Sequence, residues 1–323
     1  MLIKFLSTIL SSFLSSVIFI VIFRKISLRY NILVLRGIPL IGGLALGITF
    51  ILGCITAFSI YIPQKVQGII LASVIMLIFG LIDDWKELSV TAKFLVQIIA
   101  TFFLVLFNIR THIIYIGNIA NIIVTFIWVI GITNAINHLD VVDGLAGGVV
   151  FIAALAFFII AFLNNDIKII FMSLALIGAI LGFLIYNFPP AKIYMGNCGS
   201  HFLGFILAAI ALSISYANSE RTLALLSPLL ILGLPIFDTA FLIVVRISQG
   251  KSAFRKSEDH LALRFLKLGY SKEKTLLFML LLSSVFSFSG ILISRVSNNF
   301  GIAIIIFVGF LSLIVAKKMN FKI

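Results

Sequence analysis

The sequence predicts an all-α, polytopic integral membrane protein that forms one domain over residues 1–323 and has about 10 or 11 transmembrane helices. Composition points to this class, because 62% of the residues are hydrophobic and only 11% are charged, far from the balance of a soluble domain. The order of residues points the same way. Apolar stretches near the length that crosses a bilayer follow one another with short polar breaks.

Eleven apolar stretches are expected to form these helices. They cover residues 2–23, 38–62, 67–82, 94–107, 119–135, 145–163, 167–187, 199–217, 222–248, 275–294 and 299–316. The first stretch has the length of a signal peptide, but Lys4 precedes it, Arg24 and Lys25 follow it, and no small-x-small cleavage site ends it. We therefore expect it to stay in place as the first helix.

Basic residues predict the orientation of the helices. If the N-terminus lies outside, 18 of the 24 Lys and Arg residues fall in inner loops, which is the excess that cytoplasmic loops carry. The functional site is then expected to face the cytoplasm. The net charge of +13 then faces anionic lipid head groups and cytoplasmic anions, and no nucleic acid partner is expected.

Acidic residues gather on the same inner side, where nine of the eleven carboxylates fall. Acids at the ends of apolar helices are expensive to desolvate and usually mark a function. Asp83 and Asp84 are adjacent, so they repel each other unless a cation or a proton intervenes. This pair is expected to serve a divalent metal and proton transfer, with Lys93 nearby.

Residues 134–148 contain the densest group of oxygen-bearing side chains. Spacings of three place Asn134, Asn137, Asp140 and Asp143 on one face if the segment is helical. Carboxylate and amide oxygens are the ligands that Mg²⁺ prefers. The segment therefore predicts a site for a hard cation.

Three further inner segments carry candidate binding residues. Arg36 precedes a Gly- and Pro-containing helix start, and Lys192 lies in a segment leading to a helix N-terminus, which is a good seat for phosphate. The loop from Arg246 to Lys274 is strongly basic, and in it Asp259 is expected to orient the imidazole of His260.

The other histidines, His112, His138 and His201, are not favoured as functional residues. Asp238 is an intramembrane acid whose role stays open between a structural pair and catalysis.

Together these segments resemble the polyprenyl-phosphate N-acetylhexosamine-1-phosphate transferase family, over about residues 36–270. The matching elements are Pro39 to Gly43, Asp83-Asp84 with Leu88-Ser89 and Lys93, Asn134-x-x-Asn137-x-x-Asp140-x-x-Asp143-Gly144-Leu145, Pro190-Ala191-Lys192 with Met195-Gly196-x-x-Gly199-Ser200, and Asp238 before the basic loop. The tail motif ending at His260 is more similar to the branch that primes O-antigen or teichoic acid synthesis than to the peptidoglycan translocase.

The resemblance implies transfer of an N-acetylhexosamine 1-phosphate from a UDP-sugar to polyprenyl phosphate, with release of UMP and dependence on Mg²⁺ or Mn²⁺. The implied catalytic residues are Asp83, Asp84, Asp143 and His260; the substrate-binding residues are Arg36, Lys93, Asn134, Asp140, Lys192 and Arg264; the metal ligands are Asn137, Asn197 and Asp84. Which of Asp83 and Asp84 is the base and which is the ligand stays open. The implied partners are UDP-N-acetylhexosamine, polyprenyl phosphate and the bilayer, with a homodimer left open, and the implied location is the bacterial inner (plasma) membrane.

The chain departs from the family pattern at two places. The family usually has an aspartate, taken as a Mg²⁺ ligand, where this chain has Asn197, and several histidines where it has only His260. An amide oxygen can coordinate Mg²⁺ but brings no charge. A family member that binds lipid phosphate without catalysis is therefore one alternative.

Two other classes are weaker alternatives. Asp140-x-x-Asp143-Gly144 is half of the motif of CDP-alcohol phosphotransferases, but the second half is missing from residues 146–163. An ion-coupled transporter would also carry intramembrane acids, but no internal repeat supports it.

Overall fold

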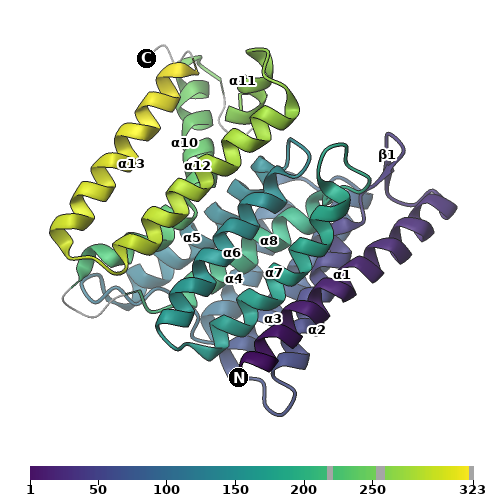
Figure 1. Cartoon of the computed structure of the whole chain (residues 1–323), viewed down its shortest axis with the longest axis horizontal. Coiled ribbons are helices and arrows are strands. Elements are labelled where there is room, and N and C mark those ends of the chain that lie inside the picture. Colours follow the sequence, from purple (N-terminus) through teal and green to yellow (C-terminus); the bar gives the residue numbers. More distant parts are fainter. Residues whose placement is uncertain (217–220, 252–258, 320–323) are drawn as a thin grey trace.

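A computed structural model describes residues 1–216, 221–251 and 259–319, so the middle of the basic loop lies outside the described residues. Helices dominate the fold (Figure 1). In chain order the elements are α1 (Leu2–Tyr30), β1 (Val34–Leu35), β2 (Ile38–Pro39), α2 (Gly42–Ala57), α3 (Gln64–Trp85), α4 (Val90–Leu106), α5 (Gly117–Leu139), α6 (Leu145–Leu163), α7 (Ile167–Asn187), α8 (Gly196–Ser213), the 3₁₀ helix η1 (Thr222–Leu226), α9 (Ser227–Ile231), α10 (Gly233–Ser248), α11 (Leu261–Lys267), α12 (Lys272–Ile293) and α13 (Asn298–Lys318).

The chain is an all-α, multi-pass membrane protein. Among the described residues, eight helices are long and apolar enough to cross a bilayer, and the bent segment from η1 to α10 would be a ninth. α2 and α4 are shorter apolar helices. Each of the eleven predicted stretches thus contains an apolar helix, although two of these helices are short for a full crossing.

The ninth stretch is broken, which the prediction of a single helix over 222–248 missed. The two parts, Thr222–Ile231 and Gly233–Ser248, meet at an angle of 74°. Pro235 has no N–H group to donate to the carbonyl of Ile231, and that carbonyl accepts a hydrogen bond from the Ser287 hydroxyl of α12 at 3.0 Å instead. The side chain of Ser287 thus stabilises the break.

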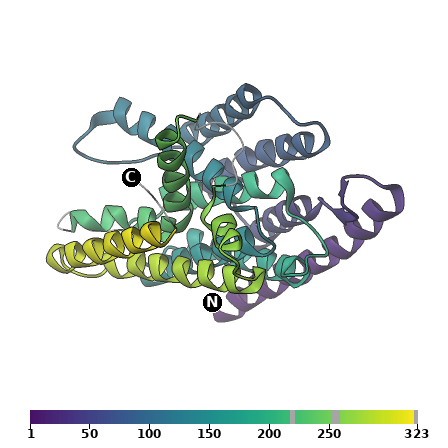
Figure 2. The same ribbon diagram turned by 90° about the horizontal axis from the view of Figure 1, so that it is seen from above.

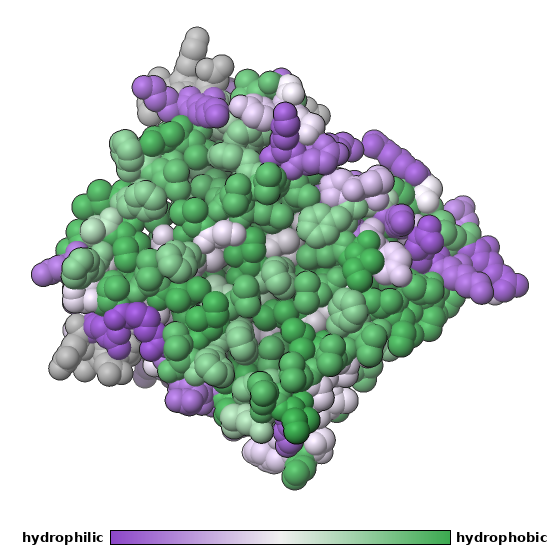
Figure 3. All heavy atoms as spheres, viewed as in Figure 1, coloured by the Kyte–Doolittle hydropathy of each residue, from purple (hydrophilic) through white to green (hydrophobic). Residues whose placement is uncertain are grey.

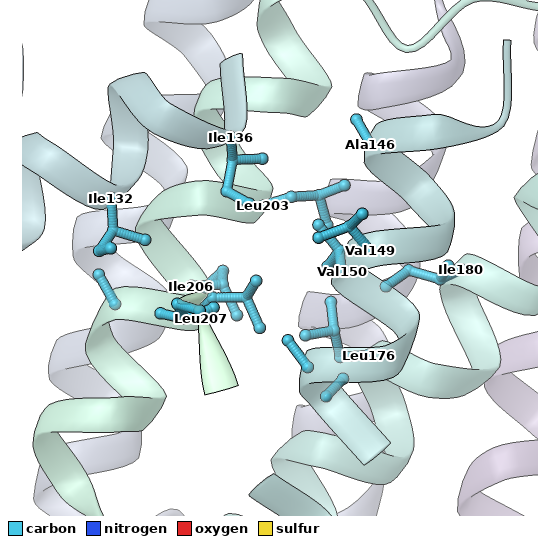
Figure 4. Packing of buried hydrophobic residues seen from close by; sticks show 14 of the residues in the cluster. Ile132, Ile136, Ala146, Val149, Val150, Leu176, Ile180, Leu203, Ile206 and Leu207 are labelled. Atoms are coloured by element: carbon cyan, nitrogen blue, oxygen red, sulfur yellow. The ribbon is translucent and has the colours of Figure 1, made fainter. Parts of the chain in front are cut away.

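The centre of the bundle is formed by α5, α6, α7 and α8, whose aliphatic side chains meet there (Figure 4). The labelled residues are Ile132 and Ile136 of α5, Ala146, Val149 and Val150 of α6, Leu176 and Ile180 of α7, and Leu203, Ile206 and Leu207 of α8. α13 lies at the periphery beside α12 (Figure 2) and is mostly exposed. Such an exposed apolar helix is expected where lipid is the solvent.

Polar residues lie mainly at the ends of the helices. Figure 3 shows hydrophilic residues along the upper and right-hand edges of the molecule, smaller hydrophilic groups at the lower left, and a broad hydrophobic surface between them. Several helix ends lie together at one of these polar sides. They are the ends of α3, α5 and α10 and the starts of α6, α8 and α11. This arrangement brings the sequence-predicted site residues to one face of the bundle.

Candidate active site

Asp84 joins the end of α3 to the start of α8. Its carboxylate accepts hydrogen bonds from the backbone N–H groups of Asn197 at 2.7 Å and Cys198 at 2.9 Å. A carboxylate at a helix N-terminus satisfies free amides and complements the helix dipole. Gly196 makes this possible, because its φ is +69° and an added Cβ would lie 2.5 Å from the Asp84 carboxylate. Asp84 therefore fixes where the side chain of Asn197 lies.

Asn197 is also held from α5. The Nδ2 atom of Asn137 donates to Oδ1 of Asn197 at 3.2 Å and to the Ser200 hydroxyl at 2.8 Å. Both donated bonds use the nitrogen of Asn137, so its Oδ1 atom is left for another contact. The two amide side chains that resemblance assigns to the metal are therefore neighbours.

Asp140 and Asp143 lie in the turn between α5 and α6. Asp143 accepts a hydrogen bond from the Ala191 N–H at 3.2 Å, which ties this turn to the loop before α8. Desolvation by surrounding protein atoms and the charges of Asp84 and Asp143 raise the pKa of Asp140 to about 7. Because the Asp140 side chain reaches solvent, the charges of Asp84 and Asp143 are the stronger of these causes. Three carboxylates thus converge here and repel one another.

The predicted helical stripe is only half correct. α5 ends at Leu139, so Asn134 and Asn137 are helical whereas Asp140 and Asp143 lie in the turn. Gly144, with a φ of +77°, ends that turn. Asn134 donates to Oε1 of Gln97 at 2.8 Å and to the Ile130 carbonyl at 2.8 Å. Its amide joins α5 to α4, and its predicted role in substrate binding stays a prediction.

Asp83 and Lys93 form an ion pair next to this cluster. The Nζ atom of Lys93 lies 2.6 Å from Oδ2 of Asp83, whose side chain is completely buried. The other oxygen of Asp83 accepts the Leu88 N–H at 2.8 Å. Both oxygens of Asp83 therefore have protein partners, and the pair connects α3 to α4. Their predicted catalytic and substrate-binding roles stay predictions.

His260 has a different partner from the one the sequence predicts. Its Nδ1 lies 2.8 Å from Oδ2 of Asp238, which is fully buried, and the other oxygen of Asp238 accepts the Leu261 N–H at 2.7 Å. Asp259 instead accepts from Nη2 of Arg264 at 3.1 Å. Adjacency in sequence misidentified the partner, because the chain turns into α11 at His260 and its ring faces α10. The expectation that Asp259 orients His260 is wrong.

Of the remaining basic candidates, Arg36 and Lys192 lie in segments next to the start of α8, whereas Arg264 contacts Asp259 and Met319. Arg36 is exposed in the two-residue turn between β1 and β2 and has a φ of +51°. The Pro39 carbonyl accepts the Tyr194 N–H at 2.8 Å, so this hairpin is joined to the loop before α8. Lys192 is exposed in that loop, directly after Ala191. Arg264 also donates to the Met319 carbonyl at 3.2 Å and lies over the Phe241 ring.

The chemistry of this donor set fits a divalent cation that is shared with a substrate. Within the described ranges, no three His, Cys, Asp or Glu side chains are close enough to form a metal cage. Mg²⁺ commonly binds one or two carboxylates together with waters and substrate phosphates. No described residue donates a hydrogen bond to the Asp140 carboxylate, and a cation there would relieve the repulsion among the three acids.

Sequence reasoning missed Ser200 and Gly196 as parts of the site and left the role of Asp238 undecided. Ser200 contacts Asn137, and Gly196 leaves room for Asp84. The glycines of the 195–200 segment were a signal of close approach, but only the fold shows that the approaching group is Asp84.

Carboxylates, amides and basic side chains gathered at one face of a multi-pass helical bundle are typical of a membrane protein that acts on anionic groups. The family model of Glycosyl transferase family 4 matches residues 66–215, which include the 83–93, 134–148 and 187–204 segments. The chain belongs to glycosyl transferase family 4.

Curated relatives agree with this assignment. The chain is 34% identical to a probable undecaprenyl-phosphate N-acetylglucosaminyl 1-phosphate transferase of Bacillus subtilis (strain 168), over 79% of this chain and 73% of the relative. It is 32% identical to a decaprenyl-phosphate N-acetylglucosaminephosphotransferase of Mycobacterium tuberculosis (strain ATCC 25618 / H37Rv), over 77% and 70%. A phospho-N-acetylmuramoyl-pentapeptide-transferase of Streptococcus pneumoniae (strain CGSP14) is 30% identical, over 69% and 73%. The family expected from the sequence is confirmed.

Proposed function

We propose that the protein transfers an N-acetylhexosamine 1-phosphate from a UDP-sugar to polyprenyl phosphate and releases UMP. The observation that carries this proposal is the start of α8, where Asp84 and Asn137 hold Asn197 beside the α5–α6 turn that carries Asp140 and Asp143. Family membership and the printed names of the relatives support the same reaction class. The glycan that the product starts is expected to belong to the cell envelope.

In this reaction, an oxygen of the acceptor phosphate attacks the phosphorus that carries the sugar. The bond from that phosphorus to the bridging oxygen breaks, and UMP leaves with the bridging oxygen and its electron pair. Catalysis of this kind depends mainly on positioning and charge neutralisation. Asp140, Asn137 and Asn197 would hold Mg²⁺ or Mn²⁺, which supplies neutralisation of the diphosphate charge.

The other residues position the groups that react. The Asp84 carboxylate accepts the Asn197 N–H at the start of α8. We therefore assign Asp84 a positioning role in place of the predicted role as a metal ligand. Asp143 keeps the α5–α6 turn against the loop carrying Lys192, and Lys192 and Arg36 supply exposed positive charge for phosphates. The face carrying these residues would lie at the cytoplasmic side of the inner membrane, because the basic residues gather there.

Release of UMP tests the proposed reaction. Purified protein in detergent, given undecaprenyl phosphate, a panel of UDP-N-acetylhexosamines and Mg²⁺, is expected to release UMP only when lipid and metal are both present. EDTA should stop release, and excess Mg²⁺ should restore it. Absence of lipid-dependent release with every donor would overturn the transferase proposal and favour a relative that only binds lipid phosphate. The particle mass in the same detergent would distinguish a homodimer from a monomer.

Replacing Asn197 with aspartate tests the metal site. The added charge should lower the Mg²⁺ concentration for half-maximal UMP release about tenfold, because ligand charge tunes cation affinity. The same charge should lower thermal stability without metal, since it adds a fourth acid to the cluster around Asp84, Asp140 and Asp143. Ser200→Ala is the control that removes a neighbouring contact of Asn137 without adding charge. An unchanged Mg²⁺ requirement in Asn197→Asp would exclude Asn197 as a ligand.

A further inference from the structure

Two histidine rings from distant parts of the chain meet near the end of α5. The centroids of His138, near the end of α5, and His260, at the start of α11, lie 5.7 Å apart with an angle of 57° between the rings. His138 lies two residues before Asp140 in the sequence, so the histidine pair and the carboxylates are at the same end of α5. The sequence alone gave no reason to connect the two histidines.

The His260 ring is fixed from behind by a buried acid. Asp238 of α10 is fully buried and has both oxygens occupied, one by Nδ1 of His260 and one by the Leu261 N–H. A carboxylate that accepts from one ring nitrogen fixes the orientation and the tautomer of an imidazole. This leaves Nε2 of His260 as the ring atom available for a ligand.

His138 has a polar atom that the described protein does not satisfy. Its Nδ1 atom is buried and has no hydrogen-bond partner among residues 1–216, 221–251 and 259–319. Buried polar atoms in native structures nearly always have a partner. An unsatisfied ring nitrogen beside a second, oriented imidazole indicates a place where a ligand or an ordered water supplies the missing bond.

We propose that His138 is a further substrate-binding residue and that, with His260, it contacts the phosphate group of the polyprenyl phosphate acceptor. This inference rests on the proposed function. Imidazole N–H groups are good donors to phosphate oxygens, and two rings at this separation can contact one phosphate. Asp238 is a positioning residue, because it acts through His260.

The place of the pair in the fold favours the lipid acceptor over the nucleotide sugar. α5, which carries His138, presents an apolar face outward at Ile127, which is exposed and lies about three turns before His138 on the same side of the helix. In a bilayer this face is in contact with hydrocarbon, so a phosphate on a lipid chain can reach the pair from that side. The carboxylate cluster, with its cation, is then free to take the diphosphate of the sugar donor.

Kinetics of His138→Phe and His138→Gln test this role. Both variants are expected to raise KM for undecaprenyl phosphate about 10- to 100-fold, as loss of one hydrogen bond to a charged group predicts, while KM for the UDP-sugar stays within twofold. In a cycle with His260→Phe, the double variant should lose less than the product of the two single losses, because both rings serve one phosphate. His112→Phe, in an outer loop, is the matched control and should change neither constant.

A binding measurement separates this inference from the transfer reaction. Undecaprenyl phosphate alone should raise the Tm of the wild-type protein in detergent, and this rise should be smaller in His138→Gln even if no donor is ever turned over. The Tm without lipid reports folding of each variant. An unchanged KM for the lipid in both folded variants, a change confined to KM of the UDP-sugar, or an equal Tm rise in His138→Gln and wild type would overturn the proposal.

Discussion

Replacing Asp84 with asparagine is expected to lower the rate of UMP release about 10- to 100-fold, as for other residues that orient a metal ligand, and to lower the free energy of unfolding by about 2 kcal/mol. The wild-type carboxylate accepts the N–H groups of both Asn197 and Cys198. An asparagine side chain has one oxygen, so its NH₂ group would face one of these two donors.

The loss of stability and the loss of activity have one structural cause. Without the carboxylate, the first turn of α8 loses an acceptor and a charge that complements its dipole. Asn197 sits in that turn, so its side chain would no longer be held at the site. The chemical step should therefore become slower. We expect a large decrease in kcat and a smaller change in KM.

Asp166→Asn is a matched control for this prediction. Asp166 also caps a helix, since its carboxylate accepts the Lys168 N–H at 3.1 Å and the Ile169 N–H at 3.4 Å at the start of α7. It lies at the opposite end of the bundle, and asparagine caps helices about as well as aspartate when the residue is itself the N-cap. Full activity in Asp84→Asn, measured as UMP release beside this control, would show that the carboxylate neither positions α8 nor binds the metal.

The positions of the helices could be predicted from the sequence because hydrocarbon imposes a simple rule. A helix that crosses a bilayer must be apolar over much of its length, so each of the eleven apolar stretches contains a helix in the structure. The break between Ile231 and Gly233 was not predictable in the same way. It depends on Ser287 of α12, which is far away in the sequence. The Ser287 hydroxyl donates a hydrogen bond to the Ile231 carbonyl, which Pro235 leaves without a donor.

The members of the site could be predicted, but their partners could not. Spacing and charge identified Asp83, Asp84, Asn137 and His260, because polar groups at apolar helix ends need a reason to be there. Adjacency in the sequence does not reveal these partners, and for His260 it indicated the wrong one. Asp83 and Asp84 point to different partners, α4 and α8, and His260 pairs with Asp238 rather than its neighbour. Hydrogen-bond partners depend on helix packing, which one sequence does not specify.

Replacing Lys93 with methionine is expected to lower the free energy of unfolding by about 3–5 kcal/mol, the range for leaving a buried ion without its partner. The side chain of Asp83 is completely buried, and Lys93 is its only cationic partner among the described residues. Methionine keeps much of the length of lysine but removes the charge. A titration with SDS or a thermal melt in detergent measures the change, and Lys86→Met, at an exposed lysine between α3 and α4, should stay close to wild type.

The double variant Asp83→Asn/Lys93→Met separates a structural role from a catalytic one. Asparagine carries no charge and can still accept the Leu88 N–H, so the double variant should recover most of the stability that Lys93→Met loses. If the pair only joins α3 to α4, UMP release should recover together with stability. If Asp83 accepts a proton or Lys93 binds the diphosphate, the double variant should be stable and inactive. A double variant that is no more stable than Lys93→Met would contradict the ion-pair explanation itself.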